Sequence, residues 1–215
     1  MILFSDAVFA IAITLLVIEI KIPDKEFIKE HGGISDKRIL HALGDLVPKF
    51  IGYLISFCLI GLYWSIHHRM FGFVTSYDRK LLFLNLLFLF FVALMPFSTG
   101  FYSEYAGGEL FEKQLKVPMT FYVLNFCGVG FANYFMWRRI GNQKNKLAEP
   151  PIDRFVLRQA YARSLVVPFL FFLMLPVAYF SNVLFAVYIP MLIPFAIRII
   201  RKRIDKQRHK IKVEK

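Results

Sequence analysis

Residues 82–96 read LFLNLLFLFFVALMP and carry no charged side chain. A helix on the surface of a soluble protein keeps one polar face toward water, and this stretch has no such face. A helix that spans a bilayer instead needs about 20 mostly apolar residues. Apolar residues make up 57% of the 215-residue chain and charged residues 20%. The sequence therefore predicts an integral membrane protein.

Hydropathy divides the whole chain into apolar spans separated by polar connections. We expect an all-α fold, a polytopic membrane protein with six transmembrane helices and no pore loop, with spans at residues 4–20, 48–67, 81–96, 117–137, 165–180 and 183–197. Residues 1–200 would form this membrane domain, and residues 201–215 a basic tail near anionic headgroups. The longest polar connection contains a mixed stretch, residues 37–44, that predicts a short surface helix.

Prolines recur in the last two expected spans, at Pro168, Pro176, Pro190 and Pro194. Proline is tolerated in membrane helices because neighbouring groups can satisfy the freed backbone carbonyls. We expect these prolines to kink the helices and not to break them.

Lys and Arg are distributed unevenly between the connections. Nineteen of the 27 fall in residues 69–80, 138–163 and 198–215. Cytoplasmic segments carry such an excess, so both termini are expected in the cytoplasm, which requires an even number of spans. The net charge of +12 lies between spans and in the tail, not on a face interleaved with aromatic residues. We therefore expect the lipid bilayer, and no nucleic acid, as a partner.

The chain lacks the residue patterns of metal sites and of enzymes. Cys58 and Cys127 lie in apolar stretches without CxxC or Cys/His spacing, so we interpret them as small buried hydrophobic side chains. The pair His67-His68 lacks the HExxH spacing of zinc enzymes. We expect no metal site, no catalytic residue and no cofactor, and an intramembrane enzyme is the least favoured class.

The first span is the most informative segment. At 3.6 residues per turn, Ile11, Thr14, Leu15 and Ile18 fall at i, i+3, i+4 and i+7 and form one stripe. Such a stripe on a membrane helix usually serves packing, and the alternative is that it lines a pore. A threonine in this setting usually donates to the carbonyl four residues earlier.

Polar residues of three expected spans fall at similar membrane depth. By topology, the start of the first span, the end of the second and the start of the third all lie on the cytoplasmic side. We hypothesise a structural polar cluster that fixes the first span against the next two, formed by Phe4, Ser5, Asp6, Trp64, His67, His68 and Asn85. The alternative is that the histidines are interfacial residues flanking Arg69.

The segment FSDAVFAIAITLLVIEI at residues 4–20, followed by Lys-Ile-Pro, resembles the first helix of the transmembrane-protein-175 family, the lysosomal potassium channels and their bacterial relatives. The family signature is an Arg, three residues and then Phe-Ser-Asp, which residues 4–6 match. The Arg would fall before Met1, so we expect that a few native residues precede Met1. Trp64 and His67-His68 support the resemblance. A single six-helix unit is similar to the bacterial branch, which implies the bacterial plasma membrane.

This resemblance implies a homotetramer permeable to K⁺, with the first helix of each subunit around a central pore. By similarity, Ile11 forms the narrowest hydrophobic ring, and Leu15 and Ile18 continue the apolar lining. Thr14, with Ile11, matches the layer linked to potassium preference. Rings of apolar side chains can close a pore by dewetting.

Two other membrane functions stay open. A secondary transporter is one alternative, although the sequence shows no inverted repeat and no Gly-interrupted spans in matching positions. Proton conduction is the other, because Asp6, Glu19 and the two histidines are titratable.

Overall fold

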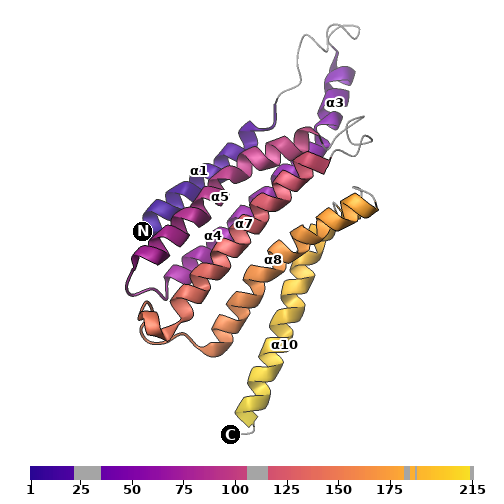
Figure 1. The fold of residues 1–215 in the computed structure, drawn as a ribbon. Helices are drawn as coiled ribbons and strands as arrows, with labels where there is room; N and C mark the ends of the chain where they lie inside the picture. The colour runs from indigo at the N-terminus through magenta and orange to yellow at the C-terminus, as the bar shows by residue number, and fades with distance from the viewer. Residues whose placement is uncertain (22–34, 106–115, 182–184, 187, 214–215) are drawn as a thin grey trace.

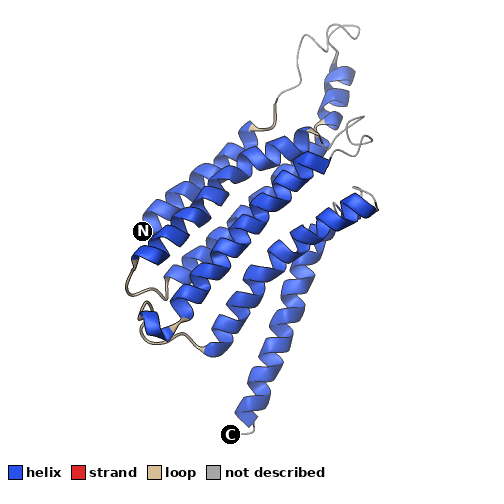
Figure 2. Ribbon diagram, viewed as in Figure 1, coloured by secondary structure: helices blue, strands red, loops and turns tan. Residues whose placement is uncertain are grey.

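The computed structural model describes residues 1–21, 35–105, 116–181, 185–186 and 188–213. Every regular element in these ranges is a helix (Figures 1 and 2). In chain order the elements are α1 (Ile2–Ile18), α3 (Asp36–Asp45), α4 (Val47–Phe71), α5 (Arg79–Glu104), α7 (Lys116–Gly141), the short 3₁₀ helix η1 (Gln143–Asn145), α8 (Arg154–Phe180), the 3₁₀ helix η2 (Ile189–Leu192) and α10 (Ile193–Val213). The expected surface helix at residues 37–44 corresponds to α3.

The first five expected spans each lie largely within one helix, in α1, α4, α5, α7 and α8. Among the described residues, three helical segments are long and apolar enough to cross a membrane: Lys49–Phe71, Arg79–Glu104 and Arg154–Phe180. Helix α1 is equally apolar but shorter, at 17 residues. Helices α5 and α8 extend beyond the expected spans because charged and polar residues continue the helix past its apolar centre.

The last expected span, residues 183–197, differs from the prediction. In the described part of this region, η2 precedes α10, and α10 begins at Ile193. Pro190 lies in η2 and Pro194 in the first turn of α10, where a missing N–H costs no helical hydrogen bond. These two prolines therefore mark a helix boundary, whereas Pro168 and Pro176 lie inside α8 as expected.

The basic residues expected as a tail, 201–215, are helical as far as Val213. Helix α10 runs from Ile193 to Val213 and crosses residue 200 without interruption. The basic residues simply continue the last helix, because straight-chain Lys and Arg are good helix formers.

The long helices pack in a simple order. Helix α1 lies on α4 and α5, α5 on α7, α7 on α8, and α8 on α10 (Figure 1). Small residues permit close contact at these interfaces. A Cβ at Gly130 of α7 would lie 2.6 Å from the ring of Pro168 in α8, and one at Gly128 would lie 2.6 Å from Phe91 in α5. Helices in a membrane associate through such small-residue contacts and through hydrogen bonds between side chains.

Buried amides supply those hydrogen bonds in the middle of the bundle. Asn125 Nδ2 of α7 donates to Ser98 Oγ of α5 at 3.0 Å, and Asn133 Nδ2 of α7 donates to Ser164 Oγ of α8 at 2.8 Å. All four residues are buried. Because these groups have no water to bond inside the bundle, each pairing fixes one helix against the next.

The N-terminus, the connections 72–78 and 142–153, and the end of α10 lie at the same end of the bundle (Figure 1). Polar groups join the two connections there. Asp78 caps α5 by accepting from the Leu81 N–H at 2.7 Å, and it also accepts from Arg139 Nε of α7 at 3.0 Å. Ser76 Oγ donates to the Lys146 carbonyl at 2.7 Å. The start of α5 is thereby fixed to the end of α7.

The hydrogen bond from Arg139 holds the pKa of the Asp78 carboxyl below its usual range, and the Leu81 N–H acts in the same direction. A carboxyl with a lower pKa in the folded than in the unfolded state stabilises the fold above its unfolded pKa. That stabilisation is lost as the pH falls through the folded pKa. Both side chains are about one-third exposed, so the contribution is that of a screened ion pair, roughly 1 kcal/mol or less.

Asp78→Asn is expected to lower the free energy of unfolding by roughly 0.5–1 kcal/mol at pH 7, because asparagine keeps the cap but loses the ion pair. The difference from the parent should shrink once the pH falls below the ordinary aspartate pKa, about 3.9, and it should vanish only below the lowered pKa of Asp78 in the folded protein. Thermal unfolding in detergent across a pH series measures it. Asp78→Ala, which also removes the cap, should cost about 1 kcal/mol more at every pH. A difference between Asp78→Asn and the parent that does not change with pH would contradict this account.

Candidate functional site: the two faces of helix α1

One face of α1 is packed into the bundle. Ser5, Phe9, Ala12 and Leu16 are all buried, and α1 contacts α4 and α5. These four residues recur at intervals of three or four, so they share one side of the helix. That side fixes the rotation of α1 about its own axis.

The opposite face of α1 is uncovered. Ile11 is 58% exposed, Leu15 41% and Ile18 68%, and Thr14 is exposed with them. The structure therefore places all four residues of the predicted stripe together, turned away from the core of the helix bundle. Helix α1 lies at one edge of the bundle in Figure 1.

The Thr14 hydroxyl is oriented by its own helix. Its Oγ1 lies 3.0 Å from the Ala10 carbonyl and 2.9 Å from the Ile11 carbonyl. A hydroxyl has one proton to donate and two lone pairs to accept with. Since the proton is donated to the backbone, the lone pairs remain free on the exposed face. An oxygen held in this way can contact a cation.

A directional chain of hydrogen bonds joins three helices behind this face. His67 Nε2 of α4 lies 2.7 Å from Asn85 Oδ1 of α5, Asn85 Nδ2 donates to Ser5 Oγ of α1 at 3.2 Å, and Ser5 Oγ donates to the Met1 carbonyl at 3.3 Å. Ser5, His67 and Asn85 are each at most 1% exposed. Because Asn85 Oδ1 can only accept, His67 carries its proton on Nε2 in this arrangement.

Aromatic rings enclose the His67 imidazole. The ring stacks on Phe88 at 5.4 Å and also packs on Phe71 at 4.4 Å and Phe9 at 5.6 Å between centroids. This apolar surround makes the single bond to Asn85 valuable, because a buried polar group without a partner is costly. Phe9 and Phe88 are not among the residues predicted for this cluster. The spacing of Phe9 from Ser5 could have indicated its role, because Phe9 lies one helical turn farther along the same buried face.

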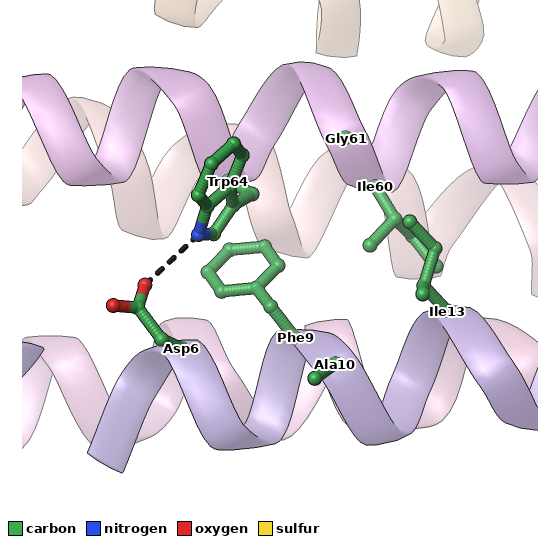
Figure 3. Close-up of a pocket in the computed structure, with 7 residues that line it drawn as sticks. All are labelled: Asp6, Phe9, Ala10, Ile13, Ile60, Gly61 and Trp64. Carbon is green, nitrogen blue, oxygen red and sulfur yellow. Dashed lines mark hydrogen bonds between the residues drawn. The ribbon is translucent and has the colours of Figure 1, made fainter. Parts of the chain in front are cut away.

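A second contact holds α1 to α4 nearer the surface. Trp64 Nε1 donates to Asp6 Oδ1 at 2.9 Å (Figure 3). Beside this pair, a groove of about 320 Å³ runs between the two helices, lined by Asp6, Phe9, Ala10, Ile13, Ile60, Gly61 and Trp64. Figure 3 shows the Phe9 ring next to the Trp64 side chain inside this groove. The flank of α1 beside the exposed face is thus open.

The structure separates two residues from the predicted polar cluster. Phe4 is 57% exposed and lies on the uncovered face of α1, because successive helical residues point about 100° apart and Phe4, Ser5 and Asp6 therefore face three directions. His68 is exposed and packs against the Trp64 ring, at 5.7 Å between centroids. Ser5, Asp6, Trp64, His67 and Asn85 make the hydrogen bonds.

The cysteines differ from one another. Cys127 is buried as expected, but Cys58 is exposed on α4, since an apolar stretch in a membrane helix has an outer as well as an inner side. Among the residues that the structure describes, no three His, Cys, Asp or Glu side chains are grouped as metal ligands. Helix α1 therefore offers apolar side chains and the Thr14 hydroxyl on its exposed face, and hydrogen bonds from Ser5 and Asp6 that hold it to the bundle.

Replacing Asn85 with leucine, which is similar in size, is expected to lower the free energy of unfolding by about 1–3 kcal/mol, because His67 loses its hydrogen-bond partner in a buried site. Thermal unfolding in detergent measures the loss. Ser5→Ala is the matched control, since it removes one acceptor of Asn85 but leaves the bond to His67, and it should cost less. Equal stability of Asn85→Leu and the parent would show that the hydrogen bonds from His67 through Asn85 to Ser5 do not hold α1 in place.

Comparison with known proteins shows which family the sequence resembles. The profile of the family described as the endosomal/lysosomal potassium channel TMEM175 matches residues 1–96, which contain α1, α4 and most of α5. A potassium channel from Streptomyces collinus is 37% identical over 150 residues, which cover 70% of this chain and 67% of that protein. The endosomal/lysosomal proton channel TMEM175 of Homo sapiens is 38% identical over 124 residues, 55% of this chain and 24% of that protein.

A solved structure extends the likeness over nearly the whole chain. The crystal structure of a lysosomal potassium-selective channel TMEM175 homologue from Chamaesiphon minutus has a TM-score of 0.74 and 26% sequence identity, and the match covers 93% of this chain and 95% of that one. The chain therefore belongs to the TMEM175 family, a family of ion channels and not of enzymes.

Proposed function

We propose that this protein is a subunit of a potassium-permeable channel and that the exposed face of α1 lines the pore. Family membership supports potassium conduction, since relatives along most of the chain are potassium channels. The single observation that carries the pore assignment is the rotation of α1. Its buried face is fixed by Ser5, Phe9 and Leu16, so Ile11, Thr14 and Ile18 have to face outward.

Exposure by itself does not distinguish a pore face from a lipid face. Helix α8 also exposes large apolar side chains, for example Phe169 at 65% and Phe172 at 58%. The exposed face of α1 differs in composition, because it combines branched aliphatic residues with the Thr14 hydroxyl and with the small residue Ala7. Small residues allow helices to approach closely, and a hydroxyl offers a passing cation an oxygen.

One helix cannot enclose a pore, so several copies of the chain are required. We propose a homotetramer with cyclic symmetry, in which each ring of the pore contains one identical side chain per subunit. The open groove between α1 and α4 leaves room on the flank of α1 for a neighbouring subunit. In this arrangement Ile11, Leu15 and Ile18 form successive apolar rings.

The apolar rings provide the gate. A narrow apolar neck loses its water and blocks ions, and a wider one refills and conducts. Thr14 lies one turn beyond Ile11, so its lone pairs can replace part of the hydration shell of an ion that passes the neck. K⁺ gives up its hydration water more easily than Na⁺, so these two layers together favour K⁺.

The position of the basic segments supports a proposal for the placement in the membrane. The N-terminus, the basic connections and the end of α10 lie at one end of the bundle (Figure 1), and basic segments stay in the cytoplasm. We propose a multi-pass protein of the bacterial plasma membrane with both termini in the cytoplasm.

Proton conduction is a second candidate, because the matched human relative is a proton channel. Asp6 lies at the start of the same helix, bonded to Trp64. Liposome flux with K⁺ alone, and with a pH gradient alone, separates the two ions. A linear current–voltage relation separates either channel from a saturable transporter.

Ile11→Asn is expected to raise K⁺ flux in liposomes and to weaken the preference for K⁺ over Na⁺, because an amide ring keeps water in the neck. Val17→Asn is the matched control. Val17 is 52% exposed on the same helix, but it lies about 120° around the axis from Ile11, so its flux should equal that of the parent. No change with Ile11→Asn, or an equal change with Val17→Asn, would remove the pore assignment while leaving family membership untouched.

A further inference from the structure

A second polar site lies away from α1, where α4, α7 and α8 meet. A small pocket of about 50 Å³ opens there, lined by Ile66, Arg69, Trp137, Val156, Gln159, Ala160 and Arg163. Its polar groups are two guanidiniums, an indole and an amide. They are donors almost without exception, which is the composition of an anion site.

Positive charge exceeds negative charge around this pocket in the described part of the chain. Arg163 is within electrostatic range of Arg69 and of Arg201 on α10, and the counter-charge there is Asp205. Asp205 already accepts from Gln159 Nε2 at 2.9 Å and lies 3.8 Å from Arg201 Nε. Among the described residues, neither Arg69 nor Arg163 has a carboxylate within ion-pair distance.

Arg69 and Arg163 therefore give this partly enclosed pocket a net positive charge. Arg163 is only partly exposed, and Arg69 is exposed at the pocket's outer side. Like charges held close together repel more strongly where water is partly excluded. An anion bound between Arg69 and Arg163 would remove that repulsion.

Trp137 gives an independent indication of a missing acceptor. Its side chain is 3% exposed, and its Nε1–H has no hydrogen-bond partner among the described residues. Buried indole N–H groups usually find an acceptor. Trp137 lines the same pocket as the two arginines, so one anionic group could satisfy all three donors.

The pocket's size and donors select the anion. A cavity needs about 10–15 Å³ of such volume for one water, so about 50 Å³ receives a few water-sized groups, like the oxygens of one phosphate. Guanidiniums bind phosphate through two parallel hydrogen bonds, which makes arginine suited to this group.

The pocket's position selects the source of the phosphate. Arg69 lies in the last turn of α4, and Arg163 lies in the third turn of α8, so the pocket is near the end of the bundle where headgroups lie. Farther along α8, Leu165 and Phe169 are exposed and offer an apolar surface to acyl chains. We propose that this pocket binds the phosphate of an anionic phospholipid through Arg69, Arg163 and Trp137.

Thermal unfolding of the full-length protein in detergent, titrated with phosphatidylglycerol or phosphatidylcholine, tests the proposal. Phosphatidylglycerol should raise the unfolding temperature of the parent more than phosphatidylcholine does. Arg163→Gln and Arg69→Gln should each lower the apparent affinity for phosphatidylglycerol about tenfold or more, as expected for a charge-assisted hydrogen bond. Without lipid, both variants should unfold at or above the parent's temperature, because they relieve repulsion. Lys202→Gln removes the same charge from an exposed position on α10 and should bind like the parent.

Three results would overturn the proposal. One is equal stabilisation by the two lipids, and another is an equal loss of binding in Lys202→Gln, which would show a diffuse charge effect. The third is full protection by inorganic phosphate at matched ionic strength, which would assign the pocket to free phosphate. Trp137→Phe replaces the indole with a smaller aromatic ring that has no N–H and leaves both arginines in place, so weaker phosphatidylglycerol binding by this variant supports the assigned donor.

Discussion

The hydrogen-bonded chain from His67 through Asn85 to Ser5 is the constraint on which the arrangement of α1 depends. Inside an apolar bundle these groups have no water to bond, so the helices must bring them together. Only one rotation of α1 places Ser5 against Asn85. That rotation also buries Phe9, Ala12 and Leu16 and turns the opposite side outward.

The exposed face of α1 is thus determined by the packing of its buried face. A helix of 17 residues with apolar side chains all round has no amphipathic pattern to orient it, and its rotation must come from a few polar contacts. The Ser5 bond and the Asp6–Trp64 bond provide two such contacts at the same end of the helix. From there, helical geometry alone carries Ile11, Thr14 and Ile18 to one side.

Much of this could be predicted from the sequence because helical periodicity is regular. The stripe on α1 and the proximity of Asp6, His67 and Asn85 follow from spacing and from topology. Phe4 was assigned to the polar cluster by its place in the motif, although its angular position puts it on the other face. Membership in a motif depends on the order of residues, whereas contact depends on the direction in which a side chain leaves the helix axis.

The end of the chain shows a different limit of sequence reasoning. Hydropathy predicts which residues are apolar, but it does not predict where a 3₁₀ helix gives way to an α-helix. Residues 183–197 are therefore expected to form one continuous span, whereas the structure has a helix boundary at Pro190 and Pro194. Likewise, hydropathy cannot tell which side of α4 faces outward, and Cys58 was expected inside. The pocket around Arg163 was also missed, because its residues come from three helices that are far apart in the chain.

The central claim is that the exposed face of α1 borders the path of the ion. Its most direct test is chemical access from water to single cysteines on α1 during K⁺ flux, in a Cys58→Ser background that removes the exposed native thiol. A positively charged thiol reagent is predicted to block flux through Thr14→Cys and to leave Val17→Cys unaffected. Block of Val17→Cys alone, or of neither variant, would show that ions pass elsewhere.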